Sequence, residues 1–228
     1  MKIVVIEPDE ASGEYFLSKL STADNLNLRR CMVNIAPRVL KNKINESDQV
    51  TKDFQDAILD CRVSNEDAAV IACNTLQLWL PKIDSGGVKI ITTFEAVDWK
   101  IKETGLSPVW LGTWPLVREI NNKKKYKTLV SLGRSDLQDL VQELIWRTKA
   151  VEGSDISGAG DIEDVRNEEK LKEISTILFE SFEEIGVNLV VLGCTELPLL
   201  IDKYLQGRLP KGITLWDPAE LIAEMLKV

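Results

Sequence analysis

One short pattern occurs twice in this chain, once in each half. In the first copy an apolar run ends in Ala-Cys-Asn-Thr at residues 72–75, and in the second a similar run ends in Gly-Cys-Thr-Glu at residues 193–196. Each copy predicts a buried strand that brings a cysteine, Cys73 or Cys194, to the start of a helix. A chain with two such copies is expected to fold as two similar halves.

The rest of the sequence alternates between apolar and amphipathic segments. Apolar runs that predict further strands lie at residues 2–6, 28–36, 88–92, 109–113 and 213–216. Segments that predict helices lie at residues 14–20, 49–62, 74–81, 95–103, 115–121 and 168–185. Alternating strands and helices favour parallel sheets that are covered by helices on both faces. We therefore predict an α/β fold.

A change in composition at residues 104–108, Thr-Gly-Leu-Ser-Pro, indicates a domain boundary. We predict a first domain of residues 1–104 plus 210–228, which carries Cys73, and a second domain of residues 105–209, which carries Cys194. The two domains are expected to be related by pseudo-symmetry. Ligands of open parallel sheets bind at the carboxyl ends of the strands, where both cysteines lie. The active site is therefore expected in the cleft between the domains.

The overall charge restricts the partners. The chain of 228 residues has a net charge of −8, which argues against nucleic acid and anionic membranes as partners. No apolar run reaches the roughly 18 residues of a membrane span, and the N-terminus shows no signal-peptide pattern. We expect a cytoplasmic protein whose four cysteines are reduced.

The chain has no histidine, and its cysteines form no CxxC pair. These two facts exclude Ser-His-Asp and Cys-His nucleophilic mechanisms and most zinc sites. We therefore expect the chemistry to come from the two repeated cysteines, without a metal. Cys31 and Cys61 lack the strand-to-helix setting and are expected in the core.

The setting of Cys73 and Cys194 suits acid–base chemistry. A helix N-terminus carries unpaired N–H groups and a partial positive charge, which lower the pKa of a thiol. The same N–H groups can bind a substrate carboxylate. With two opposed thiols, one thiolate can remove a proton from one face of a carbon centre while the other thiol returns a proton to the opposite face.

These two motifs resemble the paired motifs of the cofactor-independent aspartate/glutamate racemase family. The sequence Leu-Gly-Cys-Thr-Glu-Leu-Pro-Leu-Leu at residues 192–200 is most similar to the aspartate racemase branch, because glutamate racemases usually carry His in place of Glu196. Residues 11–16, 111–113 and 216–219 also resemble segments of the family. The resemblance implies a PLP-independent racemase, a homodimer, that interconverts the L and D forms of an acidic amino acid without a cofactor.

The resemblance also assigns roles to residues beside the cysteines. Cys73 and Cys194 would be the two bases. Asn74, Thr75 and Thr195 would hold the α-carboxylate and amino group of the substrate. For these three residues, helix capping is the alternative interpretation.

Four more residues complete the predicted site. Thr113 would line the cleft, and Arg38 and Lys149 are the basic candidates for binding the distal carboxylate of the substrate. Glu196 is either a carboxylate that orients Cys194 or a first-turn residue favoured by the helix dipole.

The chain departs from the family after its first strand. The family usually has a glycine-rich turn there, whereas this chain has Glu-Pro-Asp-Glu at residues 7–10. Pro8 has no N–H to donate, and three carboxylates would repel a dicarboxylate substrate unless they point away or bind its ammonium group.

Other functions remain open at this point. The substrate is aspartate, glutamate or a related acidic amino acid. Hydantoin racemases, maleate isomerases and malonate decarboxylases are similar, but the decarboxylases use a single cysteine, and this chain retains two. A ligand-binding protein that has lost turnover is the alternative from another class, while nothing in the sequence recommends a scaffold protein.

Overall fold

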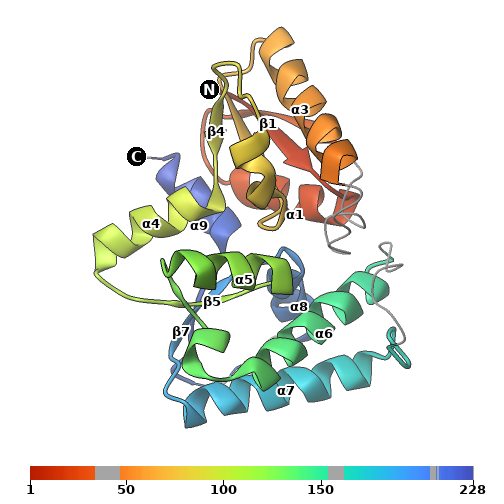
Figure 1. Cartoon of the computed structure of the whole chain (residues 1–228), viewed down its shortest axis with the longest axis vertical. Coiled ribbons are helices and arrows are strands. Elements are labelled where there is room, and N and C mark those ends of the chain that lie inside the picture. Colours follow the sequence, from red (N-terminus) through yellow and green to blue (C-terminus); the bar gives the residue numbers. More distant parts are fainter. Residues whose placement is uncertain (34–46, 154–161, 206–208, 210, 228) are drawn as a thin grey trace. The chain divides into compact units, whose positions relative to one another are not determined.

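The computed structural model describes residues 1–33, 47–153, 162–205, 209 and 211–227. The chain divides into two compact units (Figure 1). Unit 1 comprises Met1–Thr104 and Pro218–Val228, and unit 2 comprises Gly105–Asp217. Each unit contains a four-stranded parallel sheet with helices packed against it, which confirms the predicted α/β fold of two similar halves.

The sheet of unit 1 has the strand order β2-β1-β3-β4. Its strands are β1 (Lys2–Glu7), β2 (Asn27–Met32), β3 (Ala68–Ile71) and β4 (Lys89–Ile91). Its helices are α1 (Glu10–Leu20), α3 (Ser47–Val63), the 3-10 helix η2 (Leu76–Lys82), α4 (Thr93–Thr104) and α9 (Pro218–Met225). The buried face of α3, including Phe54 and Ile58, packs on Val4 and Ile6 of β1. Helix α9 packs against both α1 and α4.

The sheet of unit 2 has the strand order β6-β5-β7-β8. Its strands are β5 (Val109–Leu111), β6 (Lys127–Thr128), β7 (Leu189–Leu192) and β8 (Thr214–Trp216). Its helices are α5 (Trp114–Lys123), the 3-10 helix η3 (Val130–Leu132), α6 (Ser135–Val151), α7 (Glu168–Glu184) and α8 (Glu196–Tyr204). Side chains from α6, α7 and α8 share one apolar core with β5 and β7.

The two sheets have the same topology. In each, the second strand lies at one edge, followed by the first, third and fourth strands. The third strand is therefore central in both units, and Cys73 and Cys194 follow these two central strands. In each sheet the first and third strands are neighbours whose connections leave in opposite directions, which is where ligands bind in open α/β sheets.

The strands before the two cysteines form because they are apolar at every position. All four residues of β3 and all four of β7 are buried. Burial on both faces, rather than on alternate residues, is typical of central strands in parallel sheets.

Two sequence-based expectations differ from the structure. Strand β8 pairs with β7 in unit 2, and the chain returns to unit 1 only at Pro218, so the boundary lies after Asp217 rather than after residue 209. The segment at 74–81 forms a 3-10 helix that contains Pro81 rather than an α-helix. Proline lacks the N–H group that an α-helical hydrogen bond at that position requires.

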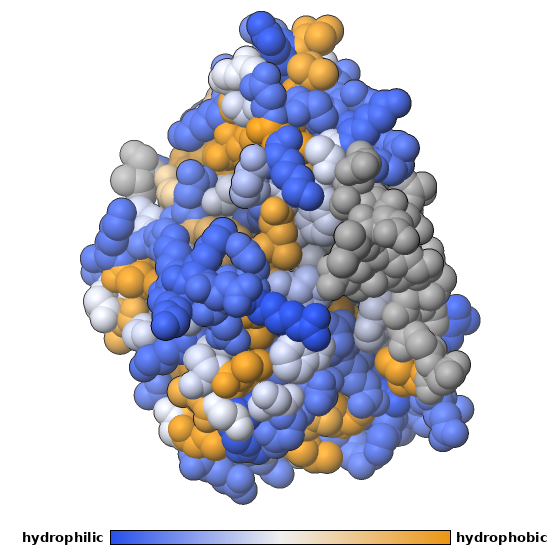
Figure 2. Space-filling model, in the orientation of Figure 1, coloured by the Kyte–Doolittle hydropathy of each residue, from blue (hydrophilic) through white to orange (hydrophobic). Residues whose placement is uncertain are grey.

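The visible surface is mostly hydrophilic, with apolar side chains in small groups between polar ones (Figure 2). Within the described ranges, the exposed large apolar residues are scattered along the sequence, from Met1 to Ile177. None of the described helices combines the length and apolar content that crossing a membrane requires.

Candidate active site

The thiol of Cys194 is held by a carboxylate two residues further along the chain. Cys194 lies between β7 and α8, is 6% exposed, and its Sγ donates a hydrogen bond to Oε2 of Glu196 at 2.8 Å. The hydroxyl of Thr195 donates to the same oxygen at 3.2 Å. Glu196 is therefore an orienting carboxylate for Cys194 as well as a first-turn residue of α8.

The other oxygen of the Glu196 carboxylate belongs to an ion pair. Oε1 contacts Nζ of Lys149, and the two side chains are 4% and 7% exposed, respectively. Buried charges in proteins require such pairing because removing an ion from water is costly. Lys149, Glu196 and Cys194 thus form a continuous buried chain from an ammonium group through a carboxylate to a thiol.

The two helices that supply this chain favour its charges. Lys149 lies in the last turn of α6, where the helix dipole favours a cation, and Glu196 is the first residue of α8, where it favours an anion. Helix α6 packs against α8, and both contribute apolar side chains to the core of unit 2. The same packing that forms the core therefore brings Lys149 to Glu196.

The end of β7, just before Cys194, packs closely against the end of β5. A Cβ atom on Gly193 would lie 1.9 Å from Nε1 of Trp110 and 2.3 Å from the carbonyl oxygen of Leu111. A Cβ atom on Gly112 would lie 3.1 Å from the carbonyl oxygen of Gly193. These two glycines allow the ends of β5 and β7 to approach each other, which places the turn after β5 beside the turn that carries Cys194.

Two glutamines of α6 fix the turn after β5 on either side of Thr113. Nε2 of Gln138 donates to the carbonyl oxygen of Gly112 at 2.8 Å, and the backbone N–H of Trp114 donates to Oε1 of Gln142 at 2.9 Å. Thr113 itself is completely buried. Neither glutamine was predicted as a site residue from the sequence, where the available signal was their spacing of four residues on one amphipathic helix.

In unit 1, the equivalent cysteine has a different partner. Sγ of Cys73 accepts a hydrogen bond from the backbone N–H of Leu76 at 3.4 Å, and Cys73 is half-buried. Asn74 and Thr75 are buried at 2% and 1% exposure. Within the described parts of the chain, Oδ1 of Asn74 is buried without a hydrogen-bond partner. Buried polar atoms in native proteins are rarely left unpaired, so Asn74 is a candidate ligand contact.

The fold is similar to that of three solved structures. A Picrophilus torridus aspartate racemase superposes with a TM-score of 0.69 at 18% identity, over 99% of this chain and 92% of that chain. An aspartate racemase homologue from Pyrococcus horikoshii gives a TM-score of 0.60 at 19% identity, over 99% and 96%. A glutamate racemase from Campylobacter jejuni gives 0.60 at 18% identity, over 100% and 85%. The chain has the fold of the aspartate and glutamate racemases.

No family model and no curated protein sequence matches the chain. The structures named above share less than 20% sequence identity with the chain, so the likeness to them is one of fold.

Carboxylates of the loop after β1, at residues 7–10, make contacts with other groups of the protein. Glu7 is 1% exposed, and its carboxylate pairs with Arg30 at 2.9 Å. Burial raises the pKa of Glu7, an effect that Arg30 opposes. Asp9 caps α1 by accepting the backbone N–H of Ser12 at 2.9 Å. Two of the three carboxylates at residues 7–10 are thus engaged by the protein.

The structure places the predicted site residues in two groups. Cys73, Asn74 and Thr75 lie together in unit 1. The group in unit 2 comprises Thr113, Lys149, Cys194, Thr195 and Glu196. Arg38 lies outside the described residues. Neither Thr75 nor Thr195 caps its helix through its side chain in the described structure, in contrast to the capping interpretation.

Cys61 belongs to the core of unit 1, as expected, whereas Cys31 is only partly buried and packs against that core. Cys61 is completely buried, its Sγ donates to the carbonyl oxygen of Ala57 at 3.0 Å, and burial raises its pKa to about 12. Cys31 is half-buried, and burial also raises its pKa. At neutral pH both side chains are therefore protonated thiols.

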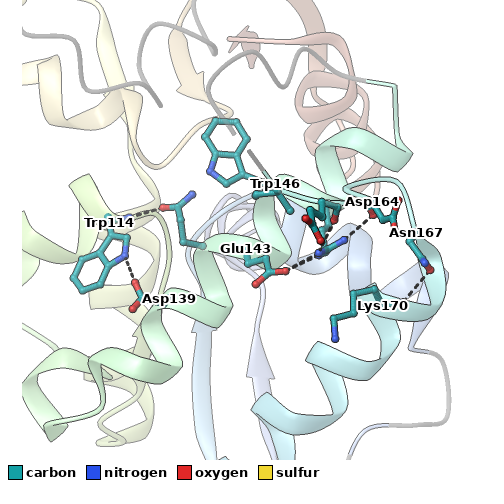
Figure 3. A pocket seen from close by; sticks show the side chains of 11 residues that line it. Trp114, Asp139, Glu143, Trp146, Asp164, Asn167 and Lys170 are labelled. Carbon is teal, nitrogen blue, oxygen red and sulfur yellow. Dashed lines mark hydrogen bonds and ion pairs between the residues drawn. The ribbon is translucent and has the colours of Figure 1, made fainter. Parts of the chain in front are cut away.

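A hollow of about 600 Å³ lies elsewhere on unit 2, along α6 and the start of α7 (Figure 3). Its wall includes Trp114, which donates through Nε1 to Asp139, and Arg147, which pairs with Glu143. None of the predicted site residues lines it. Over the described ranges, no group of three or more Cys, Asp or Glu side chains is arranged to hold a metal ion.

Proposed function

We propose that this protein is a PLP-independent amino-acid racemase of the aspartate/glutamate racemase family. Aspartate is the proposed substrate, with glutamate or another acidic amino acid as the alternative. The observation that carries the proposal is the placement of two cysteines after the central strands of two like sheets in a racemase fold. Two cysteines at equivalent positions suit a reaction in which a proton leaves one face of a carbon centre and another is added to the opposite face.

The proposed reaction is a proton transfer at the α-carbon. A thiolate at one cysteine removes the α-proton, breaking the C–H bond and leaving a carbanion beside the α-carboxylate. The thiol at the other cysteine then protonates the opposite face, which inverts the centre. The step needs no oxidant and no cofactor, because it only moves protons between carbon and sulfur.

The carbanion is the difficult intermediate, and its charge needs hydrogen-bond donors. The backbone N–H groups at the starts of η2 and α8 follow Cys73 and Cys194 directly and suit an α-carboxylate. The buried Oδ1 of Asn74 can accept a hydrogen bond from the substrate ammonium group. Thr75, Thr113 and Thr195 are proposed to complete the binding of these groups.

The distal carboxylate of the substrate requires a cation. Arg38 and Lys149 remain the proposed ligands. Because Lys149 is already paired with Glu196, it would have to serve both carboxylates at once. We further expect a cytoplasmic homodimer, with the two cysteines facing each other across the cleft between the units.

The decisive experiment follows α-proton exchange in D2O by NMR, without added cofactor, for L-aspartate and L-glutamate separately. Chiral analysis of the same samples detects inversion. We expect deuterium at the α-carbon together with the D enantiomer for one of the two substrates. If neither substrate exchanges but aspartate raises the melting temperature, the protein is a binding protein and the proposal is wrong.

A further inference from the structure

The two candidate bases have opposite hydrogen-bond roles, although they occupy equivalent positions. We propose that Glu196, supported by Lys149, is a positioning residue that keeps Cys194 protonated, so that the free protein carries its reactive thiolate at Cys73. The consequence for catalysis rests on the proposed function, but the protonation states of the thiols do not.

The geometry at Cys194 requires a proton on sulfur. Sγ lies 2.8 Å from Oε2 of Glu196, and a carboxylate can only accept hydrogen bonds. A thiolate at that position would put two anions in contact in a site where Cys194 is 6% exposed. Such like-charge contacts favour the neutral form of one partner.

The other contacts of Glu196 show which partner stays neutral. Its carboxylate receives the ammonium of Lys149 on Oε1 and the hydroxyl of Thr195 on Oε2, in addition to the thiol. The carboxylate thus acts as the acceptor in all three contacts, and the thiol is one of its three donors. The proton therefore stays on Cys194.

Two further charged groups lie on elements that pack beside β7 and α8 in the described part of unit 2, and they do not reverse this balance. Asp217 follows β8, the strand next to β7, and adds a second acid at this edge of the sheet. Arg147 on α6 is engaged by Glu143 and by the backbone carbonyls of residues 163 and 164. The helix dipole of α8 favours a thiolate, but a carboxylate in direct contact with the sulfur acts at a shorter distance.

At Cys73 the hydrogen bond to Leu76 has the opposite direction. Its Sγ accepts the backbone N–H of Leu76 at 3.4 Å, at the start of η2. A hydrogen bond donated to sulfur stabilises the thiolate. Cys73 is also less deeply buried than Cys194, so its charged form loses less hydration.

The asymmetry gives the reaction a starting direction. The free enzyme would first bind the enantiomer whose α-proton faces Cys73. The thiolate of Cys73 takes this proton and Cys194 gives its own to the opposite face, which leaves a thiol at Cys73 and a thiolate at Cys194. That thiolate lies against Glu196, so the enzyme form left after this step is the less stable one and regains its resting protonation by proton exchange.

The test is alkylation by iodoacetamide across a pH series, with peptide mass mapping and without substrate. We expect the midpoint for Cys73 to lie at least about one pH unit below that for Cys194. In Glu196→Gln the midpoint for Cys194 should fall by about one unit or more, because the amide removes the anion while Lys149 stays, and that for Cys73 should not change. Glu152→Gln is the matched control, since Glu152 pairs with Lys203 and Tyr204 in the same unit.

Cys61 reports on folding in each sample, because it is completely buried and reacts only when unit 1 opens. Thiolate ultraviolet absorbance of Cys73→Ala and Cys194→Ala gives the same two midpoints without depending on reagent access. A lower midpoint for Cys194 than for Cys73 in the otherwise unaltered protein would overturn the proposal even if Glu196→Gln does not fold. Equal midpoints in an active racemase would reject this inference alone, whereas the expected midpoints without any racemisation would reject only the proposed function.

Discussion

The carboxylate of Glu7 lies directly over Gly13, in the space that a larger residue would fill with its Cβ atom. A Cβ atom on Gly13 would be 1.2 Å from Oε2 of Glu7. Gly13 belongs to α1, and Glu7 ends β1 in an ion pair with Arg30. The glycine is therefore required by the ion pair beside it rather than by the backbone of the helix.

This contact reverses the usual effect of a helix substitution. Replacing glycine by alanine inside a helix normally stabilises a protein by about 1 kcal/mol. Here we expect Gly13→Ala to destabilise by roughly 1–3 kcal/mol, because the new methyl group displaces Glu7 from Arg30. In a Glu7→Ala background the same change should cost much less, because only the Cβ atom of residue 7, at 2.9 Å, remains in the way. Urea unfolding of the four proteins of this cycle measures both effects, and equal effects in the two backgrounds would contradict the argument.

The repeat itself supplies a second comparison, between Gly193 and its counterpart Ala72. The end of β3 accommodates the methyl group of Ala72, whereas at Gly193 a methyl group would collide with Trp110 and with the backbone of Leu111. We expect Gly193→Ala to lower stability by about 3 kcal/mol or more, and Ala72→Gly to cost about 1 kcal/mol. Thermal unfolding shows which of the two variants loses more stability. Similar small losses would mean that the end of β5 moves to accept the new methyl group.

Cys61 is expected to lower the free energy of unfolding as the pH rises into the alkaline range. Burial raises its pKa from 9.0 to about 12, so the unfolded chain loses this proton at a lower pH than the folded protein does. Stability is complete below about pH 9 and should fall by about 1.4 kcal/mol per pH unit from there towards pH 12. Cys61→Ala should remove this slope while lowering stability by a constant amount. The free energy of unfolding of both proteins is measured by urea unfolding at several pH values. The same dependence on pH in both proteins would show that Cys61 is not the cause of the slope.

The buried pair of Lys149 and Glu196 should respond differently to single and double changes. Lys149→Met leaves a buried carboxylate without its cation, for which we expect a loss of about 3–5 kcal/mol. Adding Glu196→Gln removes the uncompensated charge and should recover most of that loss. The free energies of unfolding of the two single variants and the double variant test this. Additive losses would mean that the two side chains do not depend on each other.

Much of the fold could be predicted from the sequence because β3 and β7 are apolar at every position. A central strand of a parallel sheet is buried on both faces, so its sequence alone marks it. Strand β8 was assigned to the wrong domain, since residues 213–216 predict a strand but not its neighbour. Pairing between strands distant in sequence is decided by tertiary packing.

The site could be predicted only where its residues are adjacent in the sequence. Cys194, Thr195 and Glu196 are consecutive, so the motif already contained the contact between thiol and carboxylate. Lys149 reaches Glu196 because α6 packs on α8, and its pairing with a carboxylate of the protein could not be read from the motif. The pairing of Glu7 with Arg30 depends in the same way on β1 lying beside β2.

The last prediction concerns the reaction itself. Cys73→Ala and Cys194→Ala should each reduce racemisation by about 10²–10⁴-fold, because each removes one of the two groups that exchange a proton with the α-carbon. Each variant should retain α-proton exchange with one enantiomer, the one whose proton faces the remaining cysteine. If Cys73 is the resting base, exchange should be faster in Cys194→Ala than in Cys73→Ala. Cys31→Ala makes the same chemical change at a half-buried cysteine outside the motifs and should leave activity intact. Full racemase activity in either active-site variant would rule out the two-base scheme.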